Sequence, residues 1–196
     1  GACYSSLHSH TVVDAHKSFI GDYIIGNVLM TMNSPSYLRH TKTIAINSVK
    51  KLAQKFKSSY AMTPRFAITT HPEVMTKGSE IAKKNQSFIQ THLSETEFEI
   101  KTVLGIYQDI KGFEDVKSYT DIYHRCKCLG PKTIMGHGIH LDLDELKFLA
   151  KTKTKIAHCP TSNAPLAQKG LGSGLFDFKK ADKHKVDWAL ASDIGG

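Results

Sequence analysis

The stretch Ser87-Phe-Ile-Gln-Thr-His-Leu-Ser-Glu95 joins a short run of β-forming residues to a helix-like segment, residues 96–106. Phe and Ile in a short apolar run favour an extended strand. The segment that follows is longer and amphipathic, with apolar residues spaced as on one face of a helix. The stretch therefore predicts a β-strand that leads through a short loop into an α-helix.

The same alternation recurs along the 196 residues, without a low-complexity tract or a linker. Pro72 before Glu73 suits a helix start, and Asp142 with Glu145 resembles a capping box. The predicted strands are Ala2–Ser5, Tyr23–Met30, Tyr60–Thr63, Ser87–Gln90, Thr133–Gly136, Lys155–Ala157 and Val186–Ala191. The predicted helices are Ile44–Phe56, Glu73–Lys84, Thr96–Ile106, Leu143–Lys151 and Asp177–Lys183.

Strands that alternate with helices indicate an α/β fold with a parallel sheet covered by helices. Periodicity alone leaves two architectures open, a (β/α) barrel and an open doubly wound sheet. A dinucleotide-binding fold would need GxGxxG after the first strand, and a P-loop would need GxxxxGK[ST]; neither motif is present. We interpret the glycine-rich loop Gly170–Gly174 as a plain turn, because it lacks the Lys and Ser/Thr of a phosphate-binding loop.

Composition limits the class of protein. The chain is 40% hydrophobic and 22% charged, as in a globular protein, and its longest apolar run, Tyr23–Met32, is too short to span a bilayer. The chain shows no signal peptide and has four cysteines, which favours a cytoplasmic protein with reduced thiols. The lysines behind the net charge of +8 are scattered, so we expect no nucleic-acid partner and no membrane partner. Cys126-Lys-Cys128 has no second cysteine pair, so we do not interpret it as a zinc site.

Chemically competent side chains follow three of the predicted strands. His92, His137 and Asp193 each lie at the carboxyl end of a different strand, and in a parallel barrel these ends share one rim, where active sites occur. Any one of these histidines taken singly is better explained as a core or loop residue, but three in the same register favour a site. Imidazole and carboxylate groups are both zinc ligands. Glu95 could carry protons beside a metal if a helix begins near it, or it could cap that helix.

Four motifs follow one another along the chain: Thr91-His-Leu-Ser-Glu95, Met135-Gly-His-Gly138, His158-Cys-Pro-Thr-Ser-Asn163 and Ala191-Ser-Asp-Ile-Gly-Gly196. Their order and approximate spacing resemble those of the amidohydrolase deaminases, and Thr63-Pro-Arg-Phe66 narrows this resemblance to the guanine deaminases. Gly1–Ser6 is similar to the second barrel strand of the family. With the loop Asn33-Ser-Pro-Ser-Tyr37, the resemblance covers nearly the whole chain.

The resemblance implies a fold and a reaction. The fold is a (β/α)8 TIM-type barrel, incomplete, in which residues 1–196 form one domain with strands 2–8 while the first strand and the flanking β-sandwich are absent. The reaction is hydrolytic deamination of guanine to xanthine and ammonia in purine catabolism, with zinc as cofactor. We expect guanine to be the small-molecule partner and the full-length protein to be a homodimer.

The resemblance also assigns roles to individual residues. His92 and Asp193 resemble zinc ligands, and Asp193 would in addition take a proton from the attacking water. Glu95 would shuttle that proton to a ring nitrogen, and His137 would hydrogen-bond the water or the departing group. His92, Glu95 and Asp193 would line the substrate pocket. The remaining assignments are Arg65 and Phe66, which would bind and pack the purine, and His158 and Asn163, which would support the loops.

His8-Ser-His10 imitates the His-x-His zinc motif of the family's first strand. We reject it, because it follows the segment that resembles the second strand and lies too near His92 in sequence. Only two of the family's zinc ligands are then identifiable, so we expect residues 1–196 alone to be inactive and to retain zinc poorly.

Two alternatives stay open. One is a related amidohydrolase that acts on another heteroaromatic amine, such as a triazine or another purine or pyrimidine; a non-purine enzyme need not have Arg65 and Phe66. The other is a catalytically inactive barrel that serves as an interaction module. Loss of His92, Glu95 or Asp193 would have favoured that second alternative, and all three are present.

Overall fold

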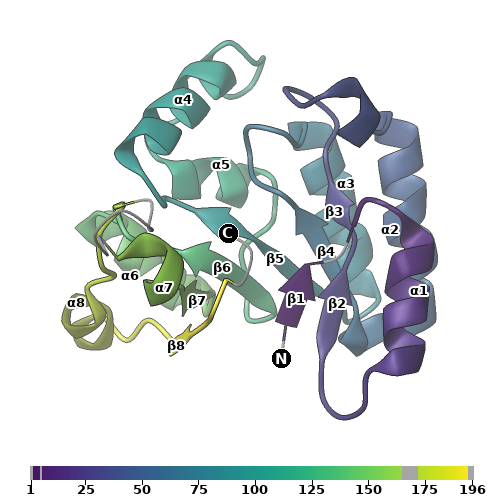
Figure 1. Ribbon diagram of the computed structural model, residues 1–196. Coiled ribbons are helices and arrows are strands. Elements are labelled where there is room, and N and C mark those ends of the chain that lie inside the picture. The colour runs from purple at the N-terminus through teal and green to yellow at the C-terminus, as the bar shows by residue number, and fades with distance from the viewer. Residues whose placement is uncertain (1, 5, 165–171, 194–196) are drawn as a thin grey trace. The chain divides into compact units, whose positions relative to one another are not determined.

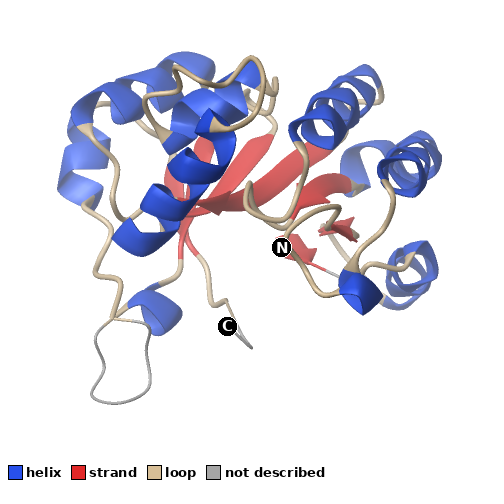
Figure 2. Ribbon diagram, turned by 90° about the horizontal axis from the view of Figure 1, so that it is seen from above, coloured by secondary structure: helices blue, strands red, loops and turns tan. Residues whose placement is uncertain are grey.

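The computed structural model describes residues 2–4, 6–164 and 172–193 (Figure 1). The chain divides into two compact units, residues 1–91 with 125–128 and residues 92–124 with 129–196, and each unit is described by itself. In both units parallel strands are flanked by helices (Figure 2), so the predicted α/β class is confirmed. Among the described residues, no helix is both long enough and apolar enough to cross a membrane.

The first unit contains short parallel strands and three α-helices. Strand β1 pairs with β2, and β3 pairs with β4, which in turn pairs with the start of β5. The strands are β1 (Ala2–Tyr4), β2 (Ile24–Gly26), β3 (Val28–Leu29), β4 (Ala61–Pro64) and β5 (Phe88–Leu93). The helices are α1 (Ser9–Ser18), α2 (Lys42–Phe56) and α3 (Pro72–Lys84), with 3-10 turns at η1 (Ser36–Leu38) and η2 (Lys57–Ser59).

Asn27 interrupts the strand that the sequence predicts over residues 23–30. Its buried side chain accepts a hydrogen bond from the Tyr60 hydroxyl over 2.7 Å and donates one to Ser48 Oγ over 3.2 Å. Beside it, Gly26 lies so close to β4 that a Cβ atom would overlap Thr63 Oγ1 and the Ala61 carbonyl oxygen. The apolar run therefore forms two short strands joined at a buried polar residue, where one continuous strand was predicted.

The second unit takes in the end of β5 and a parallel set of strands, β6-β7-β8. In the register, Ile134 pairs with Lys155 and Ile156 pairs with Trp188. The strands are β6 (Thr133–His137), β7 (Lys155–His158) and β8 (Trp188–Leu190). The helices are α4 (Glu97–Gln108), α5 (Tyr119–Arg125), α6 (Leu143–Thr152), α7 (Pro160–Asn163) and α8 (Phe178–Lys183).

Helix starts follow local capping chemistry. Thr41 caps α2 by accepting from the Ile44 N–H, and α3 begins at Pro72, as predicted. The predicted capping box of Asp142 and Glu145 is present at the start of α6. Caps of this kind depend on residues close in sequence, which is why the sequence alone predicts them.

Helices α1 and α5 were not predicted. Val12 is the one buried residue of α1, and α5 has only seven residues, so neither helix offers a long apolar stripe. The predicted turn at Gly170–Gly174 lies partly outside the described residues; within it, Gly172 and Gly174 adopt positive φ angles, as turn glycines do. Ser5 and residues 194–196, which also belong to predicted motifs, lie outside the described residues as well.

Candidate active site and metal centre

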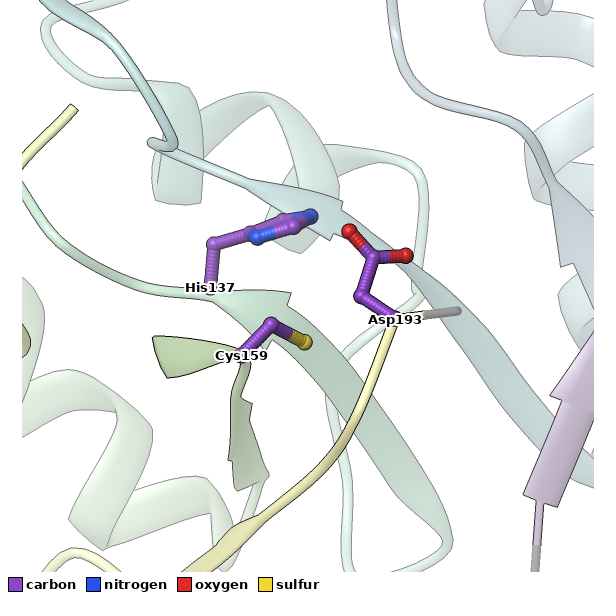
Figure 3. A group of neighbouring side chains, drawn as sticks. All are labelled: His137, Cys159 and Asp193. Carbon is purple, nitrogen blue, oxygen red and sulfur yellow. The ribbon is translucent and has the colours of Figure 1, made fainter. Parts of the chain in front are cut away.

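Three side chains with metal-binding atoms converge at the strand ends of the second unit (Figure 3). His137 ends β6, Cys159 directly follows β7, and Asp193 follows β8 by three residues. One ligand atom from each residue lies within 4.8 Å of those of the other two. The His137 ring and the Asp193 carboxylate point toward each other (Figure 3). The carboxyl ends of parallel strands therefore bring together nitrogen, sulfur and oxygen donors.

His92 lies beside this group. Strand β5 extends to Leu93, three residues beyond its predicted end, so His92 lies within the strand. Its ring stacks on that of His137, with the ring centroids 5.1 Å apart. The structure thus brings together the three strand-end residues that the sequence singled out, while His92 is not a member of the group formed by His137, Cys159 and Asp193.

Cys159 is a site residue to which the sequence analysis gave no role, although it lies within a quoted motif. The available signal was its position, because Cys159 follows β7 directly, as the other site residues follow or end their strands. Burial, and next the negative charge of Asp193, raise the pKa of this thiol to about 11. Without a metal, Cys159 is therefore a protonated thiol at neutral pH.

Asn163 connects two of the predicted catalytic residues. Its Nδ2 donates to Glu95 Oε1 over 2.8 Å and to Ser173 Oγ over 3.0 Å, and its Oδ1 lies 3.1 Å from His137 Nδ1. The residue is fully buried at the end of α7. Asn163 therefore does more than support a loop, the role that the sequence suggested, because it fixes the carboxylate of Glu95 against the ring of His137.

These contacts determine the tautomer of His137. Its Nδ1 faces two acceptors, Asn163 Oδ1 at 3.1 Å and Glu95 Oε1 at 3.3 Å. The proton of the neutral ring is therefore assigned to Nδ1, which leaves the Nε2 lone pair available. Histidines that bind metals characteristically donate their other ring N–H in this way.

Glu95 precedes helix α4, which begins at Glu97. The Thr96 hydroxyl caps that helix by accepting from the Glu99 N–H, so the expectation that Glu95 would cap it is wrong. The helix itself begins where the sequence predicted it, within one residue of Thr96. The Glu95 carboxylate instead takes part in the contacts with Asn163 and His137.

The backbone is constrained at these strand ends. His137, Asp193 and Ser94 adopt positive φ angles of 71°, 47° and 50°, a region that costs non-glycine residues free energy. The Leu93 carbonyl accepts from the Gly138 N–H over 2.9 Å, which ties the end of β5 to the end of β6. Such conformations persist where surrounding contacts determine them, and they occur preferentially at functional sites.

The donor set fits a transition metal. Imidazole nitrogen, carboxylate oxygen and cysteine sulfur are all common ligands of zinc, and His137 has the tautomer that such a ligand needs. His137 and Cys159 are buried, which limits competition from water. These residues could therefore hold a metal ion at the strand ends.

Arg65 and Phe66 lie in the first unit, directly after β4. The Arg65 guanidinium carbon is 4.8 Å from the centroid of the Phe66 ring, within range of a cation–π interaction. The Arg65 N–H donates to the Leu29 carbonyl over 3.2 Å, which holds the turn after the strand. Their purine-binding role stays a prediction.

The other two candidate metal motifs also lie in the first unit. The rings of His8 and His10 stack on each other, with centroids 5.4 Å apart at the start of α1. Cys126 and Cys128 are buried, the Cys128 sulfur lies 3.2 Å from Ser79 Oγ, and burial raises its pKa to about 12. Among the described residues, no group of three close metal donors includes any of these four.

A parallel α/β fold with carboxylate and other metal-donor side chains at its strand ends is the arrangement of the enzymes built on (β/α) barrels, and comparison identifies the family. The chain belongs to the amidohydrolase family, whose family model matches residues 9–196. It is 37% identical to the guanine deaminase of Escherichia coli over 177 residues and 30% identical to that of Mus musculus over 206 residues. The alignments cover 88% and 100% of this chain but only 38% and 43% of those two proteins.

Solved structures of guanine deaminases also match this chain. The structure of E. coli guanine deaminase matches with a TM-score of 0.86 at 34% identity, over 98% of this chain and 44% of that chain. A guanine deaminase from C. acetobutylicum with bound guanine matches with a TM-score of 0.87 at 28% identity, over 98% of this chain and 46% of that one. An atrazine chlorohydrolase from Arthrobacter aurescens, 12% identical with a TM-score of 0.81, shares the fold. The chain therefore spans less than half the length of these proteins.

Proposed function

We propose that this chain is part of a zinc-dependent deaminase that hydrolyses guanine to xanthine and ammonia. The observation that carries the proposal is the set of contacts that joins Glu95, Asn163 and His137 beside Asp193. A carboxylate held beside a histidine of defined tautomer suits proton transfer. The similarity to guanine deaminases, one of them solved with guanine bound, supports the choice of substrate. Residues 1–196 would form one barrel domain in a cytoplasmic homodimer.

Zinc is the metal that best suits the donors. Asp193 and His92 would hold it, as the resemblance implies; of the two other donors grouped with Asp193, Cys159 could add a third ligand, while His137 would serve the attacking water. When bound, zinc supplies a Lewis acid that activates water at neutral pH. Zinc binding by these side chains does not require substrate, so zinc content can be measured separately from activity.

The residues of the chain would move the protons. In guanine, water oxygen forms a bond to the ring carbon that bears the amino group, and the bond from that carbon to nitrogen later breaks. Asp193 would accept one proton of the water, and Glu95 would deliver a proton to a ring nitrogen. His137 would hydrogen-bond the water or the departing amine, which leaves as ammonia after it gains the second proton of the water.

Asn163 would act by holding Glu95 and His137, because its side chain contacts both. Arg65 would hydrogen-bond the purine and Phe66 would pack on its flat face, since an arginine and an aromatic ring suit a planar base with carbonyl oxygens. This pair would separate a purine deaminase from an enzyme that acts on a triazine or another non-purine ring. The alternative of a catalytically inactive interaction module is disfavoured, because Glu95 and His137 are present and contact each other and Asn163.

The test is a substrate panel measured with the zinc-loaded protein that carries this chain. Ammonia release is measured with guanine, adenine, cytosine and an amino-substituted triazine, and loss of guanine is followed by absorbance. We expect turnover on guanine, with formation of one xanthine per ammonia, and little on the other amines. Faster turnover of the triazine or of another base would contradict the proposal, and no turnover of any amine would favour the interaction-module alternative.

A further inference from the structure

A second buried set of side chains in the second unit contacts the backbone of the segment that carries His92 and Glu95. The Tyr123 hydroxyl donates to the His92 carbonyl over 2.8 Å, and the Tyr119 hydroxyl lies 3.3 Å from that of Tyr123. Glu99 Oε2 accepts from the Glu95 N–H over 2.8 Å. These contacts are to main-chain atoms of the segment or within the set, so the set acts on the backbone of the segment.

These side chains are buried. Tyr119 and Tyr123 are fully buried and stack with ring centroids 5.1 Å apart, and Glu99 is 8% exposed. Burying a carboxyl group costs free energy unless hydrogen bonds within the protein replace those to water. Glu99 Oε2 accepts one hydrogen bond, whereas Glu99 Oε1 is buried without a partner of hydrogen-bond geometry.

Burial disfavours the charged form of the Glu99 carboxyl group. Burial raises its pKa and outweighs the opposing contacts, which are with the Glu95 N–H, the Tyr119 hydroxyl and the Thr96 backbone; the nearby Glu95 carboxylate raises it further. A group that serves only to accept the Glu95 N–H does not need a negative charge. An amide of the same shape would keep that acceptor.

The set holds both ends of a four-residue segment, 92–95. Tyr123 on α5 fixes its first carbonyl, and Glu99 on α4 fixes its last N–H. Within the segment, Ser94 adopts a φ angle of 50°, a conformation that persists where surrounding contacts determine it. Main-chain N–H groups of residues 138–140 bond the carbonyls of Leu93 and Ser94 in the middle of the segment, and the set holds its two ends. Its two outer residues are His92, which stacks on His137, and Glu95, which accepts from Asn163.

We propose that Glu99, Tyr119 and Tyr123 are positioning residues that fix the backbone of residues 92–95 and thereby aim His92 and Glu95. The catalytic part of this inference rests on the proposed function, because deamination is its second readout. Loss of either anchor leaves the reacting groups intact but lets them move, and rates fall when catalytic groups are displaced by as little as 1 Å.

The test compares Tyr123→Phe, Glu99→Ala and Glu99→Gln in the protein that carries this chain. Hydrogen–deuterium exchange of the segment 92–95 is the first readout, and kcat and KM for guanine are the second. The matched control is Tyr107→Phe, which removes the hydroxyl of another fully buried tyrosine, at the far end of α4. The unfolding midpoint of each variant reports any general loss of stability.

We expect Tyr123→Phe and Glu99→Ala to speed exchange in residues 92–95 and to lower kcat about 10–100-fold with KM little changed, the scale of outer supporting residues. Glu99→Gln should restore slow exchange and near-parental kcat, and Tyr107→Phe should change neither. Should Glu99→Ala fail to fold, Tyr123→Phe and Glu99→Gln decide the matter. Parental exchange and kcat in Tyr123→Phe, or a Glu99→Gln variant that loses both, would overturn the proposal.

The two proposals fail in different ways. A parental protein that releases no ammonia from guanine would contradict the proposed function, while exchange in the segment 92–95 would still decide whether the anchors fix it. Faster exchange in the variants with an unchanged kcat would overturn the positioning role and leave the deaminase proposal standing.

Discussion

Asn163 donates a hydrogen bond to Glu95 across 2.8 Å, although the two residues are 68 positions apart in sequence. The same buried amide contacts His137 through its oxygen. Because one side chain contacts both groups, the Glu95 carboxylate and the His137 ring, which faces Asp193, are held in a fixed relationship. The chemistry proposed for this site depends on that relationship.

Asn163→Ala should lower kcat about 10–100-fold, because Glu95 and His137 lose their shared partner while the groups that react remain. Steady-state kinetics on guanine check this, with zinc content measured in the same samples. Asn85→Ala is the matched control, since Asn85 Nδ2 donates to the Ile81 carbonyl at the end of α3 in the first unit. Equal effects of the two substitutions would mean that Asn163 acts through stability alone.

Combined replacement His8→Ala and His10→Ala should leave zinc content and turnover unchanged, because among the described residues neither histidine belongs to a group of three close metal donors. His92→Ala should reduce both, because we assign His92 as a ligand. Metal analysis after dialysis against a weak chelator compares the variants. Loss of zinc in the His8/His10 variant, with zinc retained in His92→Ala, would reverse the assignment of the two motifs.

Glu73 links helices α2 and α3, since its carboxylate accepts from Lys42 and from Lys77, each over 2.7 Å. Hydrogen bonds from these two lysines lower its pKa from 4.5 to about 2. Because the pKa of Glu73 is lower in the folded state, its contacts with the two lysines stabilise the folded state above pH 4.5, and this stabilisation is lost as the pH falls toward 2. Because the pair is exposed, the effect is small and screened by salt.

Glu73→Gln should therefore lower the unfolding midpoint slightly at pH 7, and the difference from the parent should shrink as the pH falls from 4.5 toward 2. Thermal unfolding at low salt across this pH range measures it. Lys42→Met should show the same trend, because it removes one partner of the same carboxylate. A difference that is independent of pH would show that Glu73 acts through packing or helix propensity.

Much of this fold is predictable from local sequence patterns. The alternation of apolar runs with amphipathic segments, and caps such as Asp142, depend on neighbours a few residues apart. The break at Asn27 was missed, because it depends on hydrogen bonds with Tyr60 and Ser48, distant in sequence. Helix α1 was missed because it buries too little apolar surface to show a stripe.

The site was predictable to a similar extent. His92, His137 and Asp193 followed from one rule, that residues ending parallel strands meet at one edge. Cys159 obeys the same rule and was passed over because the motif around it was interpreted as loop architecture. The contacts of Asn163 with Glu95 and of Tyr123 with the His92 carbonyl are long-range pairings, and no local pattern in one sequence reports those.

The central claim is that Glu95 carries a proton during deamination of guanine, and Glu95→Gln tests it most directly. The amide preserves the size of the side chain and removes the group that titrates, so zinc should be retained while kcat falls by about 10²–10⁴. Glu97→Gln, an exposed neighbour in the first turn of α4, is the matched control and should turn over normally. Loss of ammonia release in Glu95→Gln with full zinc content is the predicted result, and near-parental ammonia release from that variant would contradict the account.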